Sequence, residues 1–297
     1  MCDTTARLDG KVVVVTGGSS GLGLEAAKNI AKRGARVVIA SRNETKLQKA
    51  QAEIVNTSGN YNVAYKLLDL GSLKSVRSFV NDMNGEERLD VLINNAGAIG
   101  LPDRLTADEL NLTMQVNFFG AFLLTFLLLP KLKASAPSRI INGSAASMYI
   151  GSIDFNNWND IGTHTAIQVV ASSKLAMVLF NAELAKRLKG TGVTANSFDP
   201  FIAPGTDVFF GLPSYLQDVS RIIASLIGQP KEEVGRQLGY LAAAPNLEMV
   251  SGEHYKFCGK FPSHWLVNDG VLTKKLWEES KKLVHISPEE DWELGNK

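Results

Sequence analysis

One lysine stands out in a helical pattern near the middle of the chain. The stretch VVASSKLAMVLFNAELAKRL, residues 169–188, carries apolar and small residues at helical spacing, with Lys174 as the only charge near its start. Burying an ammonium group is unfavourable unless polar partners, such as the hydroxyls of a ribose, surround it. One helical turn earlier, on the same face, the chain has Val170, which cannot exchange a proton. The pattern therefore predicts polar partners for Lys174 and offers none at the position one turn before it.

A second chemical signal is the glycine-rich stretch TGGSSGLG, residues 16–23, between the apolar run KVVVVTGG and the helical pattern LGLEAAKNIAKRG. Glycines at this junction allow a tight turn and let the backbone approach a pyrophosphate at the start of the helix. The pattern therefore predicts a dinucleotide-binding loop. The residues assigned to it are Gly17, Ser19, Ser20, Gly21, Leu22 and Gly23.

The end of the next apolar run, ARVVIASR, distinguishes between the two nicotinamide cofactors. An acidic residue here would accept from a ribose 2′-hydroxyl, whereas a cation would pair with a 2′-phosphate. The chain has Ser41 and Arg42 and no acid, which favours NADP(H). Two later loops fit the same crevice, with Asp69-Leu70 facing an adenine and the NNAG stretch behind the glycine loop. The residues of that stretch assigned to the cofactor are Asn95, Ala96 and Gly97.

These sites need strands and helices that bring them to one edge of a sheet, and the chain alternates the two regularly. Apolar runs without polar interruption alternate with amphipathic segments, which favours a parallel sheet covered on both faces. We expect an α/β fold, a Rossmann-type doubly wound parallel sheet in one domain. Its cofactor-binding core spans about residues 9–200, a substrate-covering segment about 201–255, and a C-terminal strand and helix about 256–297. A long helix is expected over residues 105–134.

Composition narrows the classes of protein. The chain has 297 residues, 45% of them hydrophobic, and a net charge of +1, so no basic surface for nucleic acid is expected. Two cysteines far apart in sequence, Cys2 and Cys258, predict neither a disulfide framework nor a metal site and fit a reducing, cytoplasmic location. The most apolar window, residues 118–130, is shorter than the roughly 20 residues of a membrane span, so no transmembrane segment is expected.

Taken together, TGGSSGLG, Asp69, NNAG and Asn117 resemble the short-chain dehydrogenase/reductase family, and closely its retinol-dehydrogenase-like branch. The resemblance covers nearly the whole chain and includes LLLPKLKASAPSRIIN, SSKLAMVLFNAELAKRLKGTGVTANS and VSGEHYKFC followed by LWEESKKLV. It implies hydride transfer between NAD(P) and a carbonyl or alcohol by an Asn-Ser-Tyr-Lys tetrad. In that tetrad the lysine lowers the pKa of the tyrosine, which acts as general acid or base.

The resemblance assigns only half of this tetrad to matching residues. Asn117 and Lys174 match the asparagine and lysine, whereas Val170 stands at the tyrosine position and Ala145 at the serine position. Pro200-Phe201 stands where the family has Pro-Gly, and a Pro-Gly pair follows at 204–205. The resemblance also assigns Lys174 and Pro200 to the cofactor. The cofactor-holding residues are therefore intact, while the proton-handling residues are replaced.

Several functions stay open. A reductase could use another acid, of which the candidates are Tyr149, His164, Ser144, Ser147 and Asp199. A hydride could also pass to an iminium or activated alkene that takes its proton from water. Alternatively, the apolar pocket could catalyse a non-redox cyclisation or isomerisation, or the chain could bind NADP(H) without catalysis.

The expected partner is a hydrophobic small-molecule substrate. The apolar stretches VFFGLPSYL and RIIASLIG in residues 206–252 match the region that covers the substrate in this family. The helices at 105–134 and 169–188 match the usual dimer faces of the family, so a homodimer is one alternative and the oligomeric state stays open.

Overall fold

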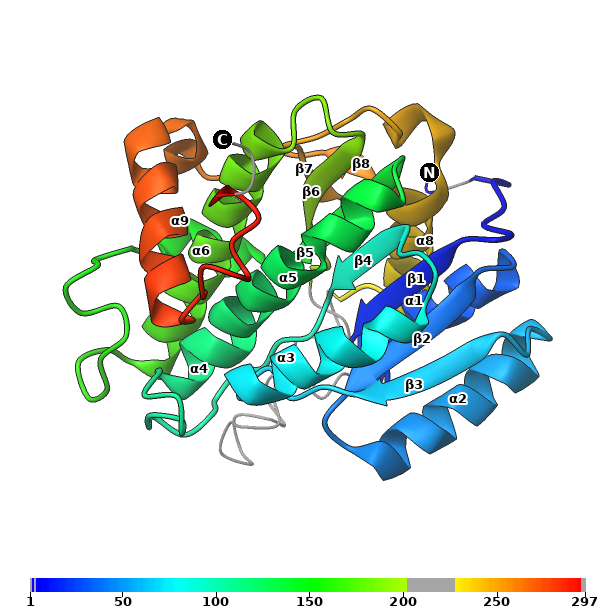
Figure 1. Ribbon diagram of the computed structural model, residues 1–297, viewed down its shortest axis with the longest axis horizontal. Coiled ribbons are helices and arrows are strands. Elements are labelled where there is room, and N and C mark those ends of the chain that lie inside the picture. Colours follow the sequence, from blue (N-terminus) through cyan, green and yellow to red (C-terminus); the bar gives the residue numbers. More distant parts are fainter. Residues whose placement is uncertain (1, 3, 202–227, 295–297) are drawn as a thin grey trace.

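The computed structural model describes residues 2, 4–201 and 228–294. Within these residues an eight-stranded sheet forms, and it lies between two layers of helices (Figure 1). The strands are β1 Val12–Thr16, β2 Arg36–Ser41, β3 Val63–Leu67, β4 Val91–Asn94, β5 Ser138–Gly143, β6 Val193–Asp199, β7 His254–Lys256 and β8 Gly259–Lys260. The longer helices are α1 Gly21–Lys32, α2 Glu44–Ser58, α3 Leu73–Asp82, α5 Gly120–Ala134, α6 Ala166–Arg187, α8 Lys231–Ala243 and α9 Gly270–Leu283. The short turns used below are α4 Leu112–Met114, η2 Gln115–Phe119, η3 Ala146–Ile150 and η6 Trp265–Asn268.

The sheet has the order β3-β2-β1-β4-β5-β6-β7-β8. All neighbouring strands pair in parallel except β7 and β8, which are antiparallel. From β1 the chain first adds β2 and β3 on one side, and then β4 and the later strands on the other. Such a reversal leaves a crevice at the carboxyl ends of the strands, where ligands of doubly wound folds bind. The fold predicted from the sequence is confirmed.

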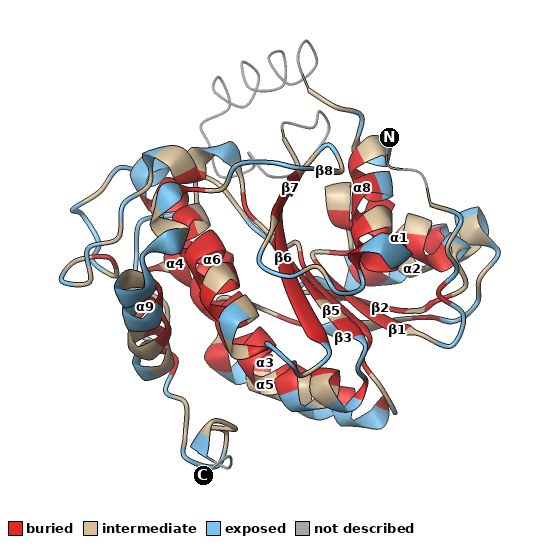
Figure 2. Cartoon of the chain, turned by 90° about the horizontal axis from the view of Figure 1, so that it is seen from above, coloured by how far each residue is buried: buried red, intermediate tan, exposed pale blue. Residues whose placement is uncertain are grey.

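Continuous apolar strands follow from burial on both faces of this sheet. In β1, Val13 and Val15 pack with residues of α1, α2 and α8, whereas Val12 and Val14 pack with residues of α3, α5 and α6. Figure 2 shows the buried strands between these two layers. Because successive side chains of a strand point to opposite faces, both parities must be apolar here.

The long apolar helix begins later than the sequence predicted. Residues 105–111 form no helix, since Leu105 and Asn111 instead pair as an isolated bridge. The helical run Leu112–Ala134 has 23 residues and is long and apolar enough to cross a membrane. The apolar helix is therefore longer than the window of residues 118–130, on which the expectation of no transmembrane segment rested. Ala166–Arg187 passes the same test. Their most apolar windows are 83% and 78% buried inside the protein, which is how core helices of a doubly wound fold behave.

The C-terminal segment covers the helices predicted to form a dimer. Figure 1 shows α9 beside α6, and Trp277 of α9 is fully buried. Its ring lies 5.3 Å from that of Phe122 and 5.7 Å from that of Phe180 between ring centroids. Trp292 lies 5.4 Å from Phe126 on α5. Within the described residues, part of both predicted dimer faces is therefore occupied by the chain's own C-terminus, and the homodimer stays a prediction.

The segment expected to cover the substrate is only partly described. VFFGLPSYL, most of RIIASLIG and the Pro-Gly pair at 204–205 lie outside the described residues. The described helix that follows, α8, packs on α1 and not over the crevice. A Cβ atom at Gly235 would lie 2.8 Å from the Glu25 backbone, so the two helices are in close contact. Its apolar residues Val234, Leu238 and Leu241 join the core on that face of the sheet.

The two cysteines form a disulfide, which corrects the prediction from their spacing. Cys2 and Cys258 are 256 residues apart in sequence, but their Cα atoms are 5.4 Å apart. Separation along the chain does not limit distance in space, and Cys258 lies in the turn between β7 and β8 at the end of the sheet. Their number and spacing therefore no longer support a reducing compartment.

Candidate functional site

The glycine loop after β1 lies directly against the loop after β4. Gly17 has φ +68°, and a Cβ atom there would lie 3.1 Å from both Ala96 Cα and Asn95 Nδ2. A Cβ atom at Gly23 would lie 2.4 Å from Gly17 O. Thr16 connects the loops, since its Oγ1 accepts from the backbone N–H groups of Asn95 and Ala96 at 3.0 Å each. Asn95 Nδ2 donates to Thr16 O at 3.0 Å. The two loops thus form one backbone-lined cradle.

The start of α1 and the end of β2 fit the phosphate and ribose of a dinucleotide. Ser20, at the start of α1, makes no side-chain cap to the described helix. Among the other longer helices, four are capped by a side chain, from Asn43, Ser72, Thr165 and Asp269. Ser41 Oγ is buried and has no hydrogen-bond partner within the described residues, and Arg42 beside it is exposed. An uncapped helix start, an unpaired hydroxyl and a nearby cation fit a phosphorylated ligand.

The two residues predicted at the adenine differ in accessibility. Asp69 is partly exposed, and its Oδ1 accepts from Gly71 N at 2.9 Å. Leu70 is buried in the core, and its backbone touches α5, where a Cβ atom at Gly120 would lie 2.4 Å from Leu70 O. The carboxylate of Asp69 is therefore available to a ligand, whereas the side chain of Leu70 packs inside.

Asn117 and Lys174 meet at the loop after β4. Asn117 lies in the π-helical turn η2, its Oδ1 accepts from Ala98 N at 2.8 Å, and its Nδ2 donates to Ser173 Oγ at 3.3 Å. A Cβ atom at Gly97 would lie 3.1 Å from Lys174 Nζ and 3.4 Å from Asn117 Oδ1. Gly97 therefore brings the two side chains together beside the cradle. Ser173 was not singled out from the sequence; its place one residue before Lys174 is the signal that could have found it.

The lysine is enclosed enough to change its acidity. Desolvation lowers the pKa of Lys174 to about 8, and the charge of Asp199 opposes the shift. Lys174 Nζ lies 3.5 Å from the carbonyl oxygen of Gly143, which is longer than a usual N–H···O hydrogen bond. Its ammonium thus has unused donor capacity that ribose hydroxyls could fill.

The positions assigned to the tyrosine and serine carry no proton donor. Val170 is buried, and Ala145 is partly exposed. The neighbouring Ser144 is buried, and its Oγ donates to the carbonyl oxygen of Lys174 at 3.0 Å, so its hydroxyl is already used by the α6 backbone. Ser147 Oγ is buried and lacks a partner within the described part of the chain.

Tyr149 is the phenol near this site, and its hydroxyl donates to the carbonyl oxygen of Pro262. Desolvation raises the pKa of Tyr149, and the charge of Asp199 raises it further. A raised pKa makes the phenol a weaker acid near neutral pH. The structure therefore gives Tyr149 a structural hydrogen bond and no feature that activates it.

A buried ion pair lies at the carboxyl ends of β6 and β7. Lys256 Nζ is 3.2 Å from Asp199 Oδ2, with side-chain exposures of 11% and 4%. Pro200, assigned to the cofactor, and Phe201 follow Asp199 directly, and Phe201 N donates to Asp199 Oδ1 at 2.8 Å. Sequence reasoning singled out Asp199 but missed Lys256, which is adjacent only through the β6–β7 register.

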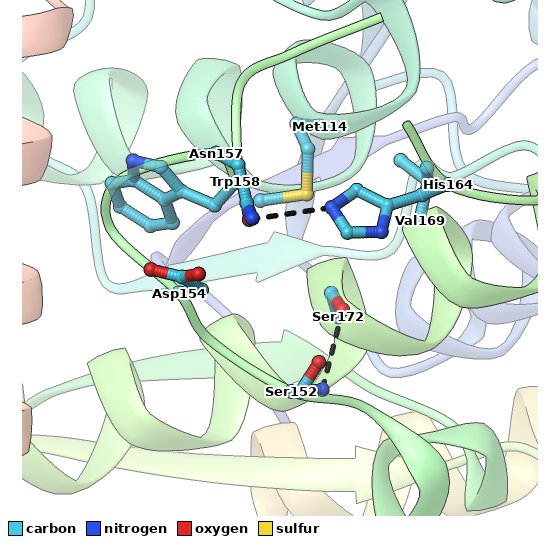
Figure 3. A pocket seen from close by; sticks show the side chains of 8 residues that line it. All are labelled: Met114, Ser152, Asp154, Asn157, Trp158, His164, Val169 and Ser172. Atoms are coloured by element: carbon cyan, nitrogen blue, oxygen red, sulfur yellow. Dashed lines mark hydrogen bonds between the residues drawn. The ribbon is translucent and has the colours of Figure 1, made fainter. Parts of the chain in front are cut away.

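His164 lies in a separate pocket of about 180 Å³ on another side of α6 (Figure 3). Its Nε2 is 3.4 Å from Asn157 Oδ1. The pocket meets α6 at Val169 and Ser172, which at 100° per residue point away from the face of Val170 and Lys174. The structure therefore does not bring His164 together with Lys174. No group of three His, Cys, Asp or Glu side chains that could hold a metal occurs among the described residues.

Comparison with known proteins agrees with this geometry. A family model for short chain dehydrogenases matches residues 11–209. Retinol dehydrogenase 11 of Mus musculus is 40% identical over 98% of this chain and 91% of that protein. Dehydrogenase/reductase SDR family member 13 of Bos taurus is 38% identical over 98% of this chain and 78% of that protein.

Solved structures show the same architecture. An uncharacterized protein from Mycobacterium Paratuberculosis superimposes with a TM-score of 0.76 at 27% identity, covering 94% of this chain and 95% of that one. The family uses NAD(P)(H), which fits the cradle, the unpaired Ser41 hydroxyl and the free donor capacity of Lys174. The chain belongs to the short-chain dehydrogenase/reductase family of oxidoreductases and is similar to its retinol dehydrogenases.

Proposed function

We propose that this chain is an atypical NADP(H)-dependent oxidoreductase that acts on a hydrophobic alcohol or carbonyl compound without the usual tyrosine and serine. The observation that carries the proposal is the arrangement at Lys174. The lysine meets Asn117 and Gly97 beside the glycine cradle, as a cofactor-holding lysine should. One turn before it stands Val170, which cannot exchange a proton.

The preference for NADP(H) follows from the end of β2. Bound there, the cofactor would supply the hydride, while Ser41 and Arg42 would hold its 2′-phosphate. The buried, unpaired Ser41 hydroxyl supports this assignment, and no acidic residue follows Arg42 directly. Asp69, Asn95 and Lys174 would orient the adenine and ribose parts through hydrogen bonds.

A hydrophobic substrate is proposed from two observations. The positions assigned to the tyrosine and serine are both apolar in this chain. The sequence is also 40% identical to retinol dehydrogenase 11 of Mus musculus over 98% of this chain. All-trans-retinal is therefore a suitable first probe, and the direction and stereochemistry of the reaction are left to the assay.

Titration with NADPH and NADH, followed by nicotinamide fluorescence, tests the cofactor. We expect tighter binding of NADPH, and Arg42→Ala should weaken NADPH by about tenfold, roughly 1.4 kcal/mol, while leaving NADH unchanged. Lys46→Ala, a cation one turn into α2, is the matched control. Equal weakening of both cofactors by Arg42→Ala would refute the 2′-phosphate role, and binding of neither would refute the proposed function.

Turnover of the probe with and without NADPH tests the redox assignment. Conversion that needs NADPH supports an oxidoreductase. Conversion of a hydrophobic substrate that persists without any cofactor would instead favour the non-redox cyclisation or isomerisation that an apolar pocket could catalyse.

A further inference from the structure

The Asp199–Lys256 ion pair is buried and has further partners on both side chains. Asp199 is 3% exposed, and both of its oxygens are used, one by Lys256 Nζ at 3.2 Å and one by Phe201 N at 2.8 Å. Three aromatic rings surround the ammonium of Lys256, with centroids 4.6 Å (Phe201), 5.4 Å (Phe257) and 5.2 Å (Phe261) from Nζ. The Asp199 carboxylate is thus held in one position inside the protein.

Strand register places this carboxylate on the face of the sheet that α6 covers. Ser144 N donates to Phe198 O at 2.8 Å, which continues the β5–β6 register by one residue and sets Asp199 beside Ser144. Side chains alternate along a strand, so Asn142, Ser144, Ser197 and Asp199 share one face. Asn142 donates to Asn181 of α6 at 3.0 Å, and Ser144 donates to the α6 backbone, so this face is the one beneath α6.

The α6 face that carries Val170 also runs toward the carboxyl edge of the sheet. Val170, Lys174 and Asn181 follow each other at four and seven residues, so they share one face of α6. Asn181 meets Asn142, and Lys174 lies over Gly143, so α6 runs toward the carboxyl edge of the sheet as its residue numbers fall. Val170, one turn beyond Lys174, therefore lies toward the carboxyl edge at which Asp199 is placed.

We propose that Asp199, fixed by Lys256, is the group that accepts and returns the substrate proton in place of the tyrosine. This inference rests on the proposed function. Oxidation needs a hydride acceptor, which the cofactor would supply when bound. As the hydride leaves the alcohol with its two electrons, the Asp199 carboxylate takes the hydroxyl proton, and it passes that proton to water after the carbonyl product has left. In reduction, for which the cofactor would supply the hydride, protonated Asp199 gives its proton to the carbonyl oxygen.

The charged and titratable groups around Asp199 come from three elements. Lys256 and His254 lie on β7, Lys174 on α6 and Tyr149 on η3, and the charge of Asp199 acts on the last three. Desolvation lowers the pKa of His254 to about 4, so this imidazole is neutral near pH 7. Two lysines, Lys174 and Lys256, therefore face the one carboxylate of Asp199.

The test compares Asp199→Asn in the natural chain and in a Val170→Tyr, Ala145→Ser background, with all-trans-retinol and NADP⁺ as the probe for oxidation and all-trans-retinal and NADPH as the probe for reduction. In the natural chain we expect kcat of the oxidation to fall at least about 100-fold, the range of a lost general base. In the background with tyrosine restored, the same change should alter kcat less than about threefold, because the tyrosine handles the proton. Asp82→Asn, the same chemical change at the exposed end of α3, is the control.

A second measurement separates proton transfer from a structural role. Lys256→Met removes the group that holds the Asp199 carboxylate at 3.2 Å, so kcat should fall in the natural chain and change less than about threefold in the Val170→Tyr, Ala145→Ser background. Thermal unfolding with NADPH shows whether each variant is folded, and the Lys256→Met comparison serves if Asp199→Asn does not fold. A Lys256→Met kcat within about threefold of the starting value in the natural chain would overturn the inference.

The remaining outcomes separate the inference from the proposed function. Equal losses in both backgrounds, or a natural-chain kcat within about threefold of the starting value, would overturn the role of Asp199 while leaving an active oxidoreductase. A natural chain that binds NADPH but converts no retinal while the Val170→Tyr, Ala145→Ser variant does would also overturn it. A natural chain that binds no NADPH refutes the proposed function itself.

Discussion

The two ends of the crevice differ in whether backbone or side-chain atoms line them. Near β1 and β4, the cofactor half (residues 16–23 and 94–97) is formed mainly by backbone, with glycines whose missing Cβ atoms leave room for neighbouring atoms. Near β5–β7, the half for which we propose proton transfer (called the proton half: Ala145, Val170, Asp199 and Lys256, with Lys174 at its border) is formed by side chains. A Cβ atom added at Gly23 or Gly17 would press against neighbouring atoms of the cradle, whereas a side-chain site can exchange one group for another. The second half can therefore acquire different chemistry within the same fold.

The largest effect is expected from filling the cradle. In Gly23→Ala the new Cβ would lie 2.4 Å from Gly17 O and 2.6 Å from Asn95 Nδ2, so backbone must move. We expect NADPH affinity to fall at least about 100-fold, about 2.7 kcal/mol. The free energy of unfolding should fall by about 1–3 kcal/mol. Fluorescence titration and urea unfolding measure the two effects.

Gly85→Ala is the control for this change, because a Cβ atom there meets nothing within 4 Å and the backbone is not left-handed. It should leave both quantities unchanged. A Gly23→Ala chain that binds NADPH normally would remove the distinction between a backbone half and a side-chain half.

Loss of the disulfide should affect stability but not the cofactor half. The Cys2–Cys258 bond closes a loop of 256 residues, and Cys258 lies two residues from Lys256 in the proton half. Cys258→Ser should lower the free energy of unfolding by about 2–4 kcal/mol through the greater freedom of the unfolded chain. NADPH affinity should stay constant. Urea unfolding with and without reductant measures the effect.

Cys2→Ser should give the same decrease, and the double variant no further one. If reductant leaves the unfolding of the natural chain unchanged, the bond contributes no stability in solution.

Lys174 should stabilise the complex with NADPH and destabilise the chain without it. Because its pKa is about 8 in the fold and about 10.4 in an unfolded chain, the unfolded state binds more protons between these values. The stability of the free protein attributable to Lys174 is therefore lowest below pH 8 and rises as pH increases toward 10.4. Lys174→Met should raise the free energy of unfolding at pH 7 by up to about 3 kcal/mol.

The same variant should bind NADPH at least about tenfold more weakly, about 1.4 kcal/mol. Lys282→Met, at an exposed lysine of α9, is the control and should do neither. Unfolding of the free protein measured at several pH values checks the sign. A Lys174→Met chain that is less stable at pH 7 but binds NADPH normally would show that the lysine is structural.

Sequence reasoning reached the cofactor half more fully than the proton half for a physical reason. A turn that needs glycine leaves its mark in consecutive residues, so Gly17 and Gly23 were identifiable. Lys256 is 57 residues from Asp199, and only strand pairing brings them together. The disulfide, and the cover that α9 places on α6, are likewise products of tertiary contact. Residues 105–111 were misassigned because their polar-apolar pattern continues that of the following helix.

The smallest effect is expected at His164, although histidine is the most suitable proton donor by type. Its pocket reaches α6 through Val169 and Ser172 (Figure 3), on a different side from Val170 and Lys174. His164→Ala should therefore change kcat for retinal by less than about twofold, far below the 100-fold or more that loss of a general acid produces. A matched titration should show unchanged NADPH affinity. If His164→Ala instead removed activity while Asp199→Asn did not, the proton would enter the site from the side of α4 and not from the sheet, and the proton half would have to be redrawn around this pocket.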